Sequence, residues 1–248
     1  MRTDLQVKRR SKASTKVTAR TLKWIAILSM MTDHFACVFL QEETRLYDFL
    51  RLLGRIAFPI YAFLLTEGFL HTTNIKKYLQ RLFFFALLSE IPFDLAFYGN
   101  PFYPEQQNIF FTLGIGLLGM FLLKKTHKSQ ENGDFMDTFL KFFLISGSCC
   151  ITAYLLHADY GAIGVLSILT LYLFRTRLQL KNKPAYLMEC GILCMISLSE
   201  AFAMIMTPIL EAYDGTPGSR KHKRIFYWLY PVHLFLYWGI LMGIKAFL

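Results

Sequence analysis

Charged residues are scarce in this chain of 248 residues. They make up 18% of it, whereas an average soluble domain carries about 25%. Hydrophobic residues reach 54%, with 24 Phe and 13 Tyr, which is more apolar surface than a soluble core of this size can hide. The composition excludes disordered and collagen-like classes and indicates a membrane protein.

Patterns typical of disulfide frameworks and metal sites are also missing. The five cysteines are odd in number, form no C-x-x-C pair and lie mostly inside apolar runs. We therefore expect neither a disulfide framework nor a metal site. No small-residue cleavage site follows the first apolar run, so we expect the first helix to be retained rather than cleaved as a signal peptide.

Acidic residues are nearly absent from the N-terminal tail. Up to Lys23 there are eight Lys and Arg residues and one acid, Asp4, so this tail holds seven of the ten net positive charges. Nucleic acid binding is one reading of such a tail. An apolar run follows at once, which favours a cytoplasmic flank that orients the first helix and touches anionic lipid. We expect no nucleic acid partner.

Apolar runs account for nearly all of the remaining chain. They lie at about 24–40, 52–70, 82–98, 109–123, 139–157, 161–174, 185–210 and 225–248. A membrane-spanning helix needs about 20 residues, so the fourth and sixth runs must borrow flanking residues. The expected fold is all-α: a polytopic integral membrane helical bundle with about eight transmembrane helices. A basic cytoplasmic tail, 1–21, precedes a single membrane-embedded domain, 22–248.

Lys and Arg in the loops predict the direction of the spans. With the N-terminus cytoplasmic, the inner loops hold most of the positive charge, and the outer loops 99–108 and 158–160 hold none. The loop 211–224 conflicts with this rule, because its cluster lies outside if all eight runs cross. Either one late run does not cross, or the cluster has a function that overrides the rule. The cluster consists of Arg220, Lys221, Lys223 and Arg224.

Ionisable side chains recur inside the runs. Each costs at least about 2.5–3.5 kcal/mol in a bilayer, so it normally faces a cavity or a partner. At 1.5 Å per residue along a helix, most of them lie at a similar depth, from the midplane toward the outer end. This placement predicts a water-filled polar pocket open to the outside. The polar residues in these runs, or at the start of one in the case of Asn108, include Asp33, His34, Arg55, Glu67, Glu90, Asp94, Asn108, Thr112 and His233.

Neighbouring helices should pair several of these groups. Asp33 and His34 lie about 100° apart around their helix, so Asp33 should not orient His34. We expect Asp33 to pair with Arg55, and Glu90 or Asp94 to accept the second ring N–H of His34. A purely structural ion pair between Arg55 and Glu90 is the alternative.

Three further features concern helix geometry. Glu67 lies near the inner face, where Lys76, Lys77 or His71 can pair with it. Pro92 should break the third helix and turn the acids beside it into the pocket. The glycines of 114–119 match the spacing of a dinucleotide-binding fingerprint but lie in an apolar run without a preceding strand, so close helix packing is the better interpretation.

Several ordered motifs resemble the TraX family of membrane acetyltransferases, over residues 21–245. They are Leu22–Ile27 with Met31–His34, Arg51–Gly68, Ser89–Leu95, Asn108–Thr112, Asp159–Gly161 and Phe226–Leu234. More distantly, the fold resembles integral membrane acyltransferases that modify surface glycans and use a histidine near the first helix. The resemblance implies N-acetylation of a pilin amino terminus from acetyl-CoA. Another extracytoplasmic amine, on a lipoprotein or an amino sugar, stays open as acceptor.

The residues suit this chemistry. His34 is the expected general base, with a covalent acetyl-His34 intermediate as the alternative. Arg55 or Asn108 is expected to stabilise the oxyanion, while Asp33 holds Arg55. The CoA phosphates are assigned to Arg220, Lys221, Lys223 and Arg224. The residues expected to bind substrate are Arg51, Glu67, Asn108, Thr112, Asp159, Tyr230 and His233.

Two other functions fit a polar membrane bundle. A transporter also lines its pathway with ionisable groups, but the polar motifs of 33–112 have no counterpart in 139–248, so no internal repeat supports it. An assembly factor can use the same groups only to hold the bundle together. Loss of His34 then harms folding, whereas in an enzyme it leaves a folded, inactive protein.

Overall fold

The computed structural model describes residues 17–128, 135–218 and 225–247. These residues form helices and two isolated bridges, and within the described ranges there is no strand, which confirms the all-α prediction. The elements are α1 (Ala19–Phe39), α2 (Arg45–Gly54), α3 (Ala57–His71), α4 (Ile75–Tyr98), α5 (Ile109–Lys128), α6 (Phe135–Leu155), α7 (Gly161–Thr176), α8 (Asn182–Leu193), the 3₁₀ helix η1 (Leu198–Met206), α9 (Thr207–Glu211) and α10 (Ile225–Phe247).

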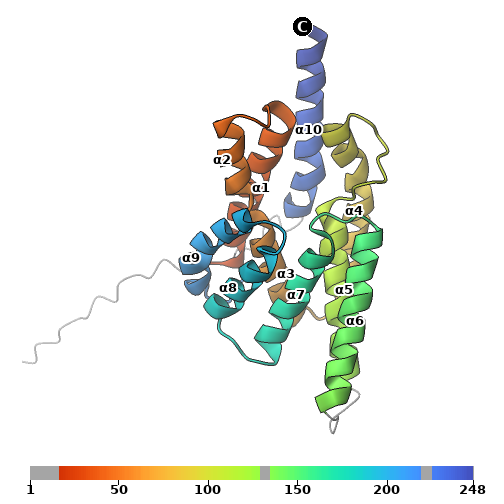
Figure 1. The fold of residues 1–248 in the computed structure, drawn as a ribbon, viewed down its shortest axis with the longest axis vertical. Helices are drawn as coiled ribbons and strands as arrows, with labels where there is room; N and C mark the ends of the chain where they lie inside the picture. Colours follow the sequence, from red (N-terminus) through yellow and green to blue (C-terminus); the bar gives the residue numbers. More distant parts are fainter. Residues whose placement is uncertain (1–16, 129–134, 219–224, 248) are drawn as a thin grey trace, which may run out of the picture.

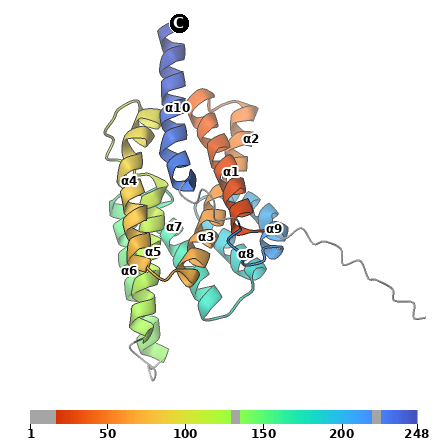
Figure 2. The same ribbon diagram turned by 180° about the vertical axis from the view of Figure 1, so that it is seen from behind.

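The first and last helices of the chain lie side by side. α10 packs between α1 and α4, and its C-terminal part extends beyond its neighbours (Figure 1). α2 covers the other side of α1, while α5, α6 and α7 form a second group that α3 joins to the first (Figure 2). Groups carried by the two ends of the chain therefore meet inside one bundle.

Four stretches in the described ranges are long and apolar enough to cross a membrane. They are Ala19–Phe39, Arg45–His71, Ile109–Thr126 and Ile225–Phe247; Phe139–Leu155 and Gly161–Thr176 are shorter apolar helices. The second stretch is broken at Arg55, where the backbone N–H groups of Arg55 and Ile56 bond three residues back. Pro59 explains this break, because its ring clashes with the carbonyl four residues earlier, at Arg55.

The seventh apolar run does not form the single spanning helix expected of it. It is divided into α8, η1 and α9, and it returns to where it began: Asn182 donates from Nδ2 to the carbonyl of Leu210 at 3.4 Å. The next residues pair with the start of α1, where the N–H of Ala19 donates to the carbonyl of Thr216 at 2.9 Å. The loop that follows α9 thus starts beside the N-terminal end of α1. This placement agrees with the alternative in which one late apolar run does not cross the membrane.

Close helix packing explains the glycines of 114–119. A Cβ at Gly116 would lie 2.7 Å from Cδ1 of Ile168, and one at Gly119 would lie 2.8 Å from Cδ2 of Leu169. α5 can approach α7 this closely only because these positions lack side chains. The structural interpretation of the fingerprint spacing is confirmed.

Candidate functional site

Two histidines from opposite ends of the chain form a hydrogen-bonded pair. Nδ1 of His34 lies 2.7 Å from Nε2 of His233, and the rings stack with centroids 5.0 Å apart. Nδ1 of His233 lies 2.7 Å from the carbonyl of Leu229, which can only accept, so this nitrogen carries a hydrogen. In the neutral pair, Nε2 of His233 then accepts from Nδ1 of His34. Nε2 of His34 is left with its basic lone pair.

Aromatic rings surround this histidine pair. Phe97 of α4 and Tyr230 of α10 contact His34 edge-on, with centroids 5.2 and 5.8 Å away. The prediction that Glu90 or Asp94 accepts from His34 was wrong, since His233 takes that place. Both histidines were singled out from the sequence, but 199 positions separate them, so their pairing had no local signal.

Asp33 faces away from the histidine pair, toward α2. Its carboxylate accepts from Nη1 of Arg51 at 2.5 Å, which corrects the expected pairing with Arg55. A Cβ at Gly54 would overlap this carboxylate, so only glycine permits its approach to α2. Arg55 pairs instead with Glu200 of η1 at 3.0 Å, and the Glu200 side chain is fully buried. Together, Asp33, Arg51, Arg55 and Glu200 form the ion-pair region.

The predicted polar residues of α4 and α5 stabilise connections between helices. Asn108 donates from its side chain to Glu90 and to the carbonyl of Ala86, so both amide hydrogens are occupied. Asp94 accepts the backbone N–H of Tyr103 at 2.8 Å. α4 is continuous through Pro92, which corrects the expectation of a break that turns these acids into a pocket. Glu90, Asp94 and Asn108 thus hold the 99–108 loop against α4.

Thr112 and Asp159 join α5 to the loop between α6 and α7. The Thr112 hydroxyl donates to the Asp159 carbonyl, and the Asp159 carboxylate accepts the N–H of Tyr160 at 3.0 Å. Burial raises the pKa of the Asp159 carboxyl to about 6. Tyr160 also adopts a positive φ of 59°, which makes this a tightly specified turn.

Glu67 lies apart from these groups. It accepts from Nη2 of Arg175 at 2.5 Å and lies 3.8 Å from His71, so His71 was rightly among its expected partners and Lys76 and Lys77 were not needed. Arg175 also bonds the side chain of Asn182 at 2.6 Å. This arrangement ties α3 to α7 and α8.

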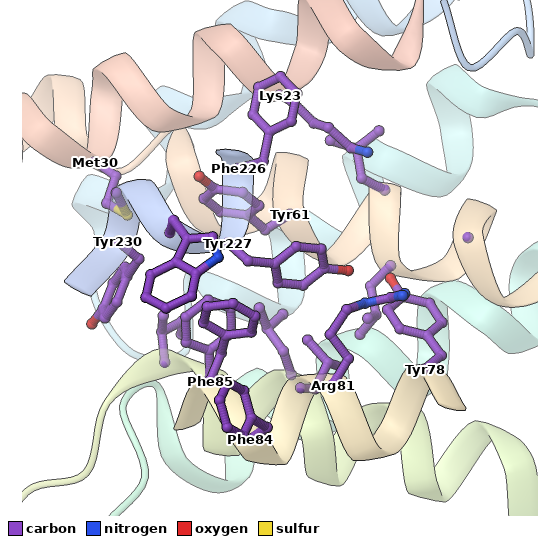
Figure 3. Close-up of a pocket in the computed structure, with 18 of the residues that line it drawn as sticks. Lys23, Met30, Tyr61, Tyr78, Arg81, Phe84, Phe85, Phe226, Tyr227 and Tyr230 are labelled. Atoms are coloured by element: carbon purple, nitrogen blue, oxygen red, sulfur yellow. The ribbon is translucent and has the colours of Figure 1, made fainter. Parts of the chain in front are cut away.

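A cavity of about 570 Å³ lies between α1, α3, α4, α5 and α10. Tyr78 and Arg81 lie at one end of it, and Met30 and Tyr230 lie at the other (Figure 3). Arg20 and Lys23, from the start of α1, also line it, and the described lining includes no carboxylate. The sequence predicted a polar pocket open to the outside, whereas this cavity is mainly aromatic and reaches the start of α1.

Arg81 is held between two aromatic rings in the cavity wall. Its guanidinium lies 5.0 Å from the ring of Tyr78 and 5.0 Å from that of Tyr227. Arg20 and Lys23 belong to the basic segment before the first apolar run, and the cavity that they share with Arg81 appears only in three dimensions. Arg220, Lys221, Lys223 and Arg224 fall outside the described residues, between Gly218 and Ile225. In the described ranges no group of three His, Cys, Asp or Glu side chains is arranged to hold a metal ion.

Comparison with known proteins identifies the relatives of this chain. The model of the TraX protein family matches residues 18–241. A probable fimbrial assembly protein, FimC of serogroup H1 from Dichelobacter nodosus, is 30% identical over 249 residues, covering 92% of this chain and 95% of that protein. No solved structure matches the chain.

Proposed function

The chain belongs to the TraX family, and from this premise we propose that it is a membrane-bound acetyltransferase that moves acetyl from cytosolic acetyl-CoA to an extracytoplasmic amine. The name of the Dichelobacter relative favours a pilin-like protein as the acceptor. One observation carries the proposal: a cavity lined by Arg20, Lys23 and Arg81 extends to Tyr230, whose ring contacts His34.

The cationic part of the cavity suits the donor. CoA carries phosphate groups at one end and a thioester at the other, joined by a slender chain. Arg forks and Lys point charges bind phosphates well, and aromatic walls stack on a nucleotide base. We assign the phosphates to Arg20, Lys23 and Arg81, together with the basic cluster at 220–224, which was predicted from the sequence to bind them. The thioester then lies toward Met30 and Tyr230.

The histidine pair suits the transfer itself. The acceptor nitrogen attacks the thioester carbonyl, so an N–C bond forms, the C–S bond breaks, and CoA leaves as the thiolate. Nε2 of His34 takes the proton that the nitrogen loses and passes it to this thiolate. His233 fixes the ring nitrogen that is free to do so. In the alternative route, Nε2 attacks first and carries the acetyl group.

Arginine is the better candidate for the oxyanion. Both amide hydrogens of Asn108 are already donated, so Asn108 is a positioning residue in this proposal. Arg55 has donors beyond the one given to Glu200 and remains the proposed oxyanion partner. Arg51, Thr112 and Asp159 then shape the acceptor side. Glu67 ties α3 to α7 and α8 through Arg175 and so stabilises the bundle.

The proposed placement follows the charges. The start of α1 and the cationic part of the cavity face the cytoplasm, and the tail 1–21 precedes a single domain in the cell membrane. The site needs no metal ion in this mechanism. Cytosolic donor and exported acceptor then reach the histidine pair from opposite sides.

Labelled acetyl transfer tests the proposal. Membranes containing the wild type, His34→Ala or His157→Asn receive radiolabelled acetyl-CoA, with equal folded protein in each sample. His157 is an exposed loop histidine with a φ of 50°, which asparagine tolerates, so it is the matched control. We expect label on an exported pilin-like protein with the wild type and His157→Asn and none with His34→Ala. Equal label in all three samples contradicts the proposal.

An assembly factor without chemistry is the second candidate, because the Dichelobacter relative is named for fimbrial assembly. In that case His34→Ala impairs assembly only as far as it impairs folding. Intact-mass analysis of the exported proteins separates the two functions. An acetyl adduct of about 42 Da that depends on His34 identifies the enzyme and its acceptor, whereas unmodified pilin with normal assembly identifies the factor.

A further inference from the structure

Tyr230 belongs both to the cavity and to the surroundings of the histidine pair. It lines the end of the cavity opposite Tyr78 and Arg81 (Figure 3) and is 4% exposed. Its ring centroid lies 5.8 Å from that of His34 and 5.7 Å from that of His233. A thioester that reaches His34 from the cavity must therefore pass this ring.

The position of the Tyr230 ring is constrained on several sides. Phe110 packs edge-on against it with centroids 5.1 Å apart. Pro231, which is also buried, restricts the backbone beside it. A buried ring held in this way cannot turn aside without loss of packing.

We infer that Tyr230 limits the acyl group to a short chain. This inference rests on the proposed function. Phe97 also contacts His34 edge-on, with centroids 5.2 Å apart, so two aromatic rings occupy space beside the imidazole. Acetyl places one methyl group beyond the carbonyl carbon. Each further methylene must occupy space that Tyr230 or Phe97 fills.

The chain-length preference is measured by competition. Membranes with the full-length protein receive equal amounts of acetyl-, propionyl- and butyryl-CoA together with a short peptide that has a free amino terminus. Mass spectrometry of the peptide gives the ratio of acyl products. We expect the wild type to favour acetyl by about 10-fold or more for each added methylene, the range in which a shaped site discriminates one methylene.

Substitution of Tyr230 should change this ratio. Tyr230→Leu removes the plane of the ring while keeping an apolar side chain, and it should bring butyryl transfer to within about threefold of acetyl transfer. Tyr230→Phe retains the ring and should keep the wild-type ratio, which separates the volume of the ring from the phenol hydroxyl. Phe85→Leu is the matched control, since Phe85 also lines the cavity but stacks on Tyr227, away from the histidine pair.

Three results overturn the inference. The first is a wild-type protein that transfers butyryl as well as acetyl, and this result counts even if Tyr230→Leu fails to fold. The second is a folded Tyr230→Leu variant that still transfers acetyl with the wild-type product ratio. The third is a shift of the ratio in Phe85→Leu as large as that in Tyr230→Leu. Both overturn the inference while the proposed function stands. Absence of transfer from every acyl-CoA overturns the proposed function as well, and it is recognised by wild-type signal equal to that of His34→Ala.

Discussion

Asp33 and His34 are adjacent in α1, yet they belong to two polar regions of different character. Asp33 points to α2 and joins the ion-pair region, in which Arg51 neutralises Asp33 and Arg55 pairs with Glu200. His34 points to α10 and joins the histidine pair, which contains no carboxylate. A rotation of about 100° between successive residues is enough to divide them.

The two regions differ in what is left available for chemistry. In the ion-pair region each charge is compensated by an opposite one, and removal of one partner leaves the other exposed to a low-dielectric surrounding. In the histidine pair the hydrogen bonds run in one direction, from His34 to His233 to the carbonyl of Leu229, and they leave Nε2 of His34 with a free lone pair. The first arrangement is suited to holding helices together, and the second to moving a proton.

The largest expected effect on catalysis, outside the proposed catalytic groups His34 and Arg55, is at His233. His233→Ala removes the acceptor that fixes the His34 tautomer, so we expect kcat to fall about 100-fold, within the usual contribution of a general base. The KM for acetyl-CoA should stay unchanged, because His233 does not line the cavity. Steady-state kinetics on solubilised protein measure both values.

A rescue variant separates orientation from packing at His233. His233→Gln places an amide oxygen where it can accept from Nδ1 of His34, and it should recover about 10-fold of the lost kcat. Tyr237→Phe, which keeps a ring against His233, is the control for packing. If Gln and Ala lower kcat equally, or if both raise KM, the histidine pair has no orienting role.

The ion-pair region should respond in stability as well as in catalysis, because Arg55 both pairs with Glu200 and is the proposed oxyanion partner. Arg55→Ala leaves the fully buried Glu200 side chain without its partner, so we expect the free energy of unfolding to fall by about 3–5 kcal/mol. The double variant Arg55→Met with Glu200→Leu removes both charges and should recover most of this loss. Thermal unfolding in detergent measures each Tm, with His34→Ala expected to stay within a few degrees of the wild type. Equal losses in the single and double variants would mean that the pair contributes packing rather than charge compensation.

The sequence was sufficient for the features that local pattern controls. Apolar runs predicted most of the long helices, though not α2 or the division of 185–210, and the glycines of 114–119 predicted close contact, because helix periodicity and side-chain size act over a few residues. It was also sufficient to single out Asp33, His34 and His233. The partners of these groups lie on other helices, and which helix faces which follows from packing alone.

Glu200 shows where a signal was present and was missed. The sequence predicts one span over 185–210, although this run holds two acids, Glu189 and Glu200, that are costly inside a bilayer. Both side chains are fully buried, and the run folds as α8, η1 and α9 rather than as one helix. An acid in an apolar run is therefore grounds to look for a partner; Glu200 has one in Arg55, whereas Glu189 has no hydrogen-bond partner among the described residues. Acids alone do not predict a break, since α4 is continuous through Glu90 and Asp94.

The smallest expected effect concerns pH and lies in the loop between α6 and α7. An unfolded aspartate titrates near 3.8, whereas burial raises the pKa of Asp159 to about 6. Between these values the folded protein keeps a proton that the unfolded chain releases, so this group lowers the free energy of unfolding as pH rises from about 4 to about 6. Above pH 6 its effect is constant.

Asp159→Asn removes this titration. The Tm of the wild type should therefore fall more between pH 4.5 and pH 6.5 than the Tm of Asp159→Asn, by a few degrees at most. Asp48→Asn is the matched control, because Asp48 lies on the exposed face of α2 outside both polar regions. Identical pH slopes for the wild type and Asp159→Asn would place the Asp159 carboxyl in ordinary solvent. A reduced slope shows instead that this loop carboxyl, unlike the paired acids of the ion-pair region, is held without full compensation.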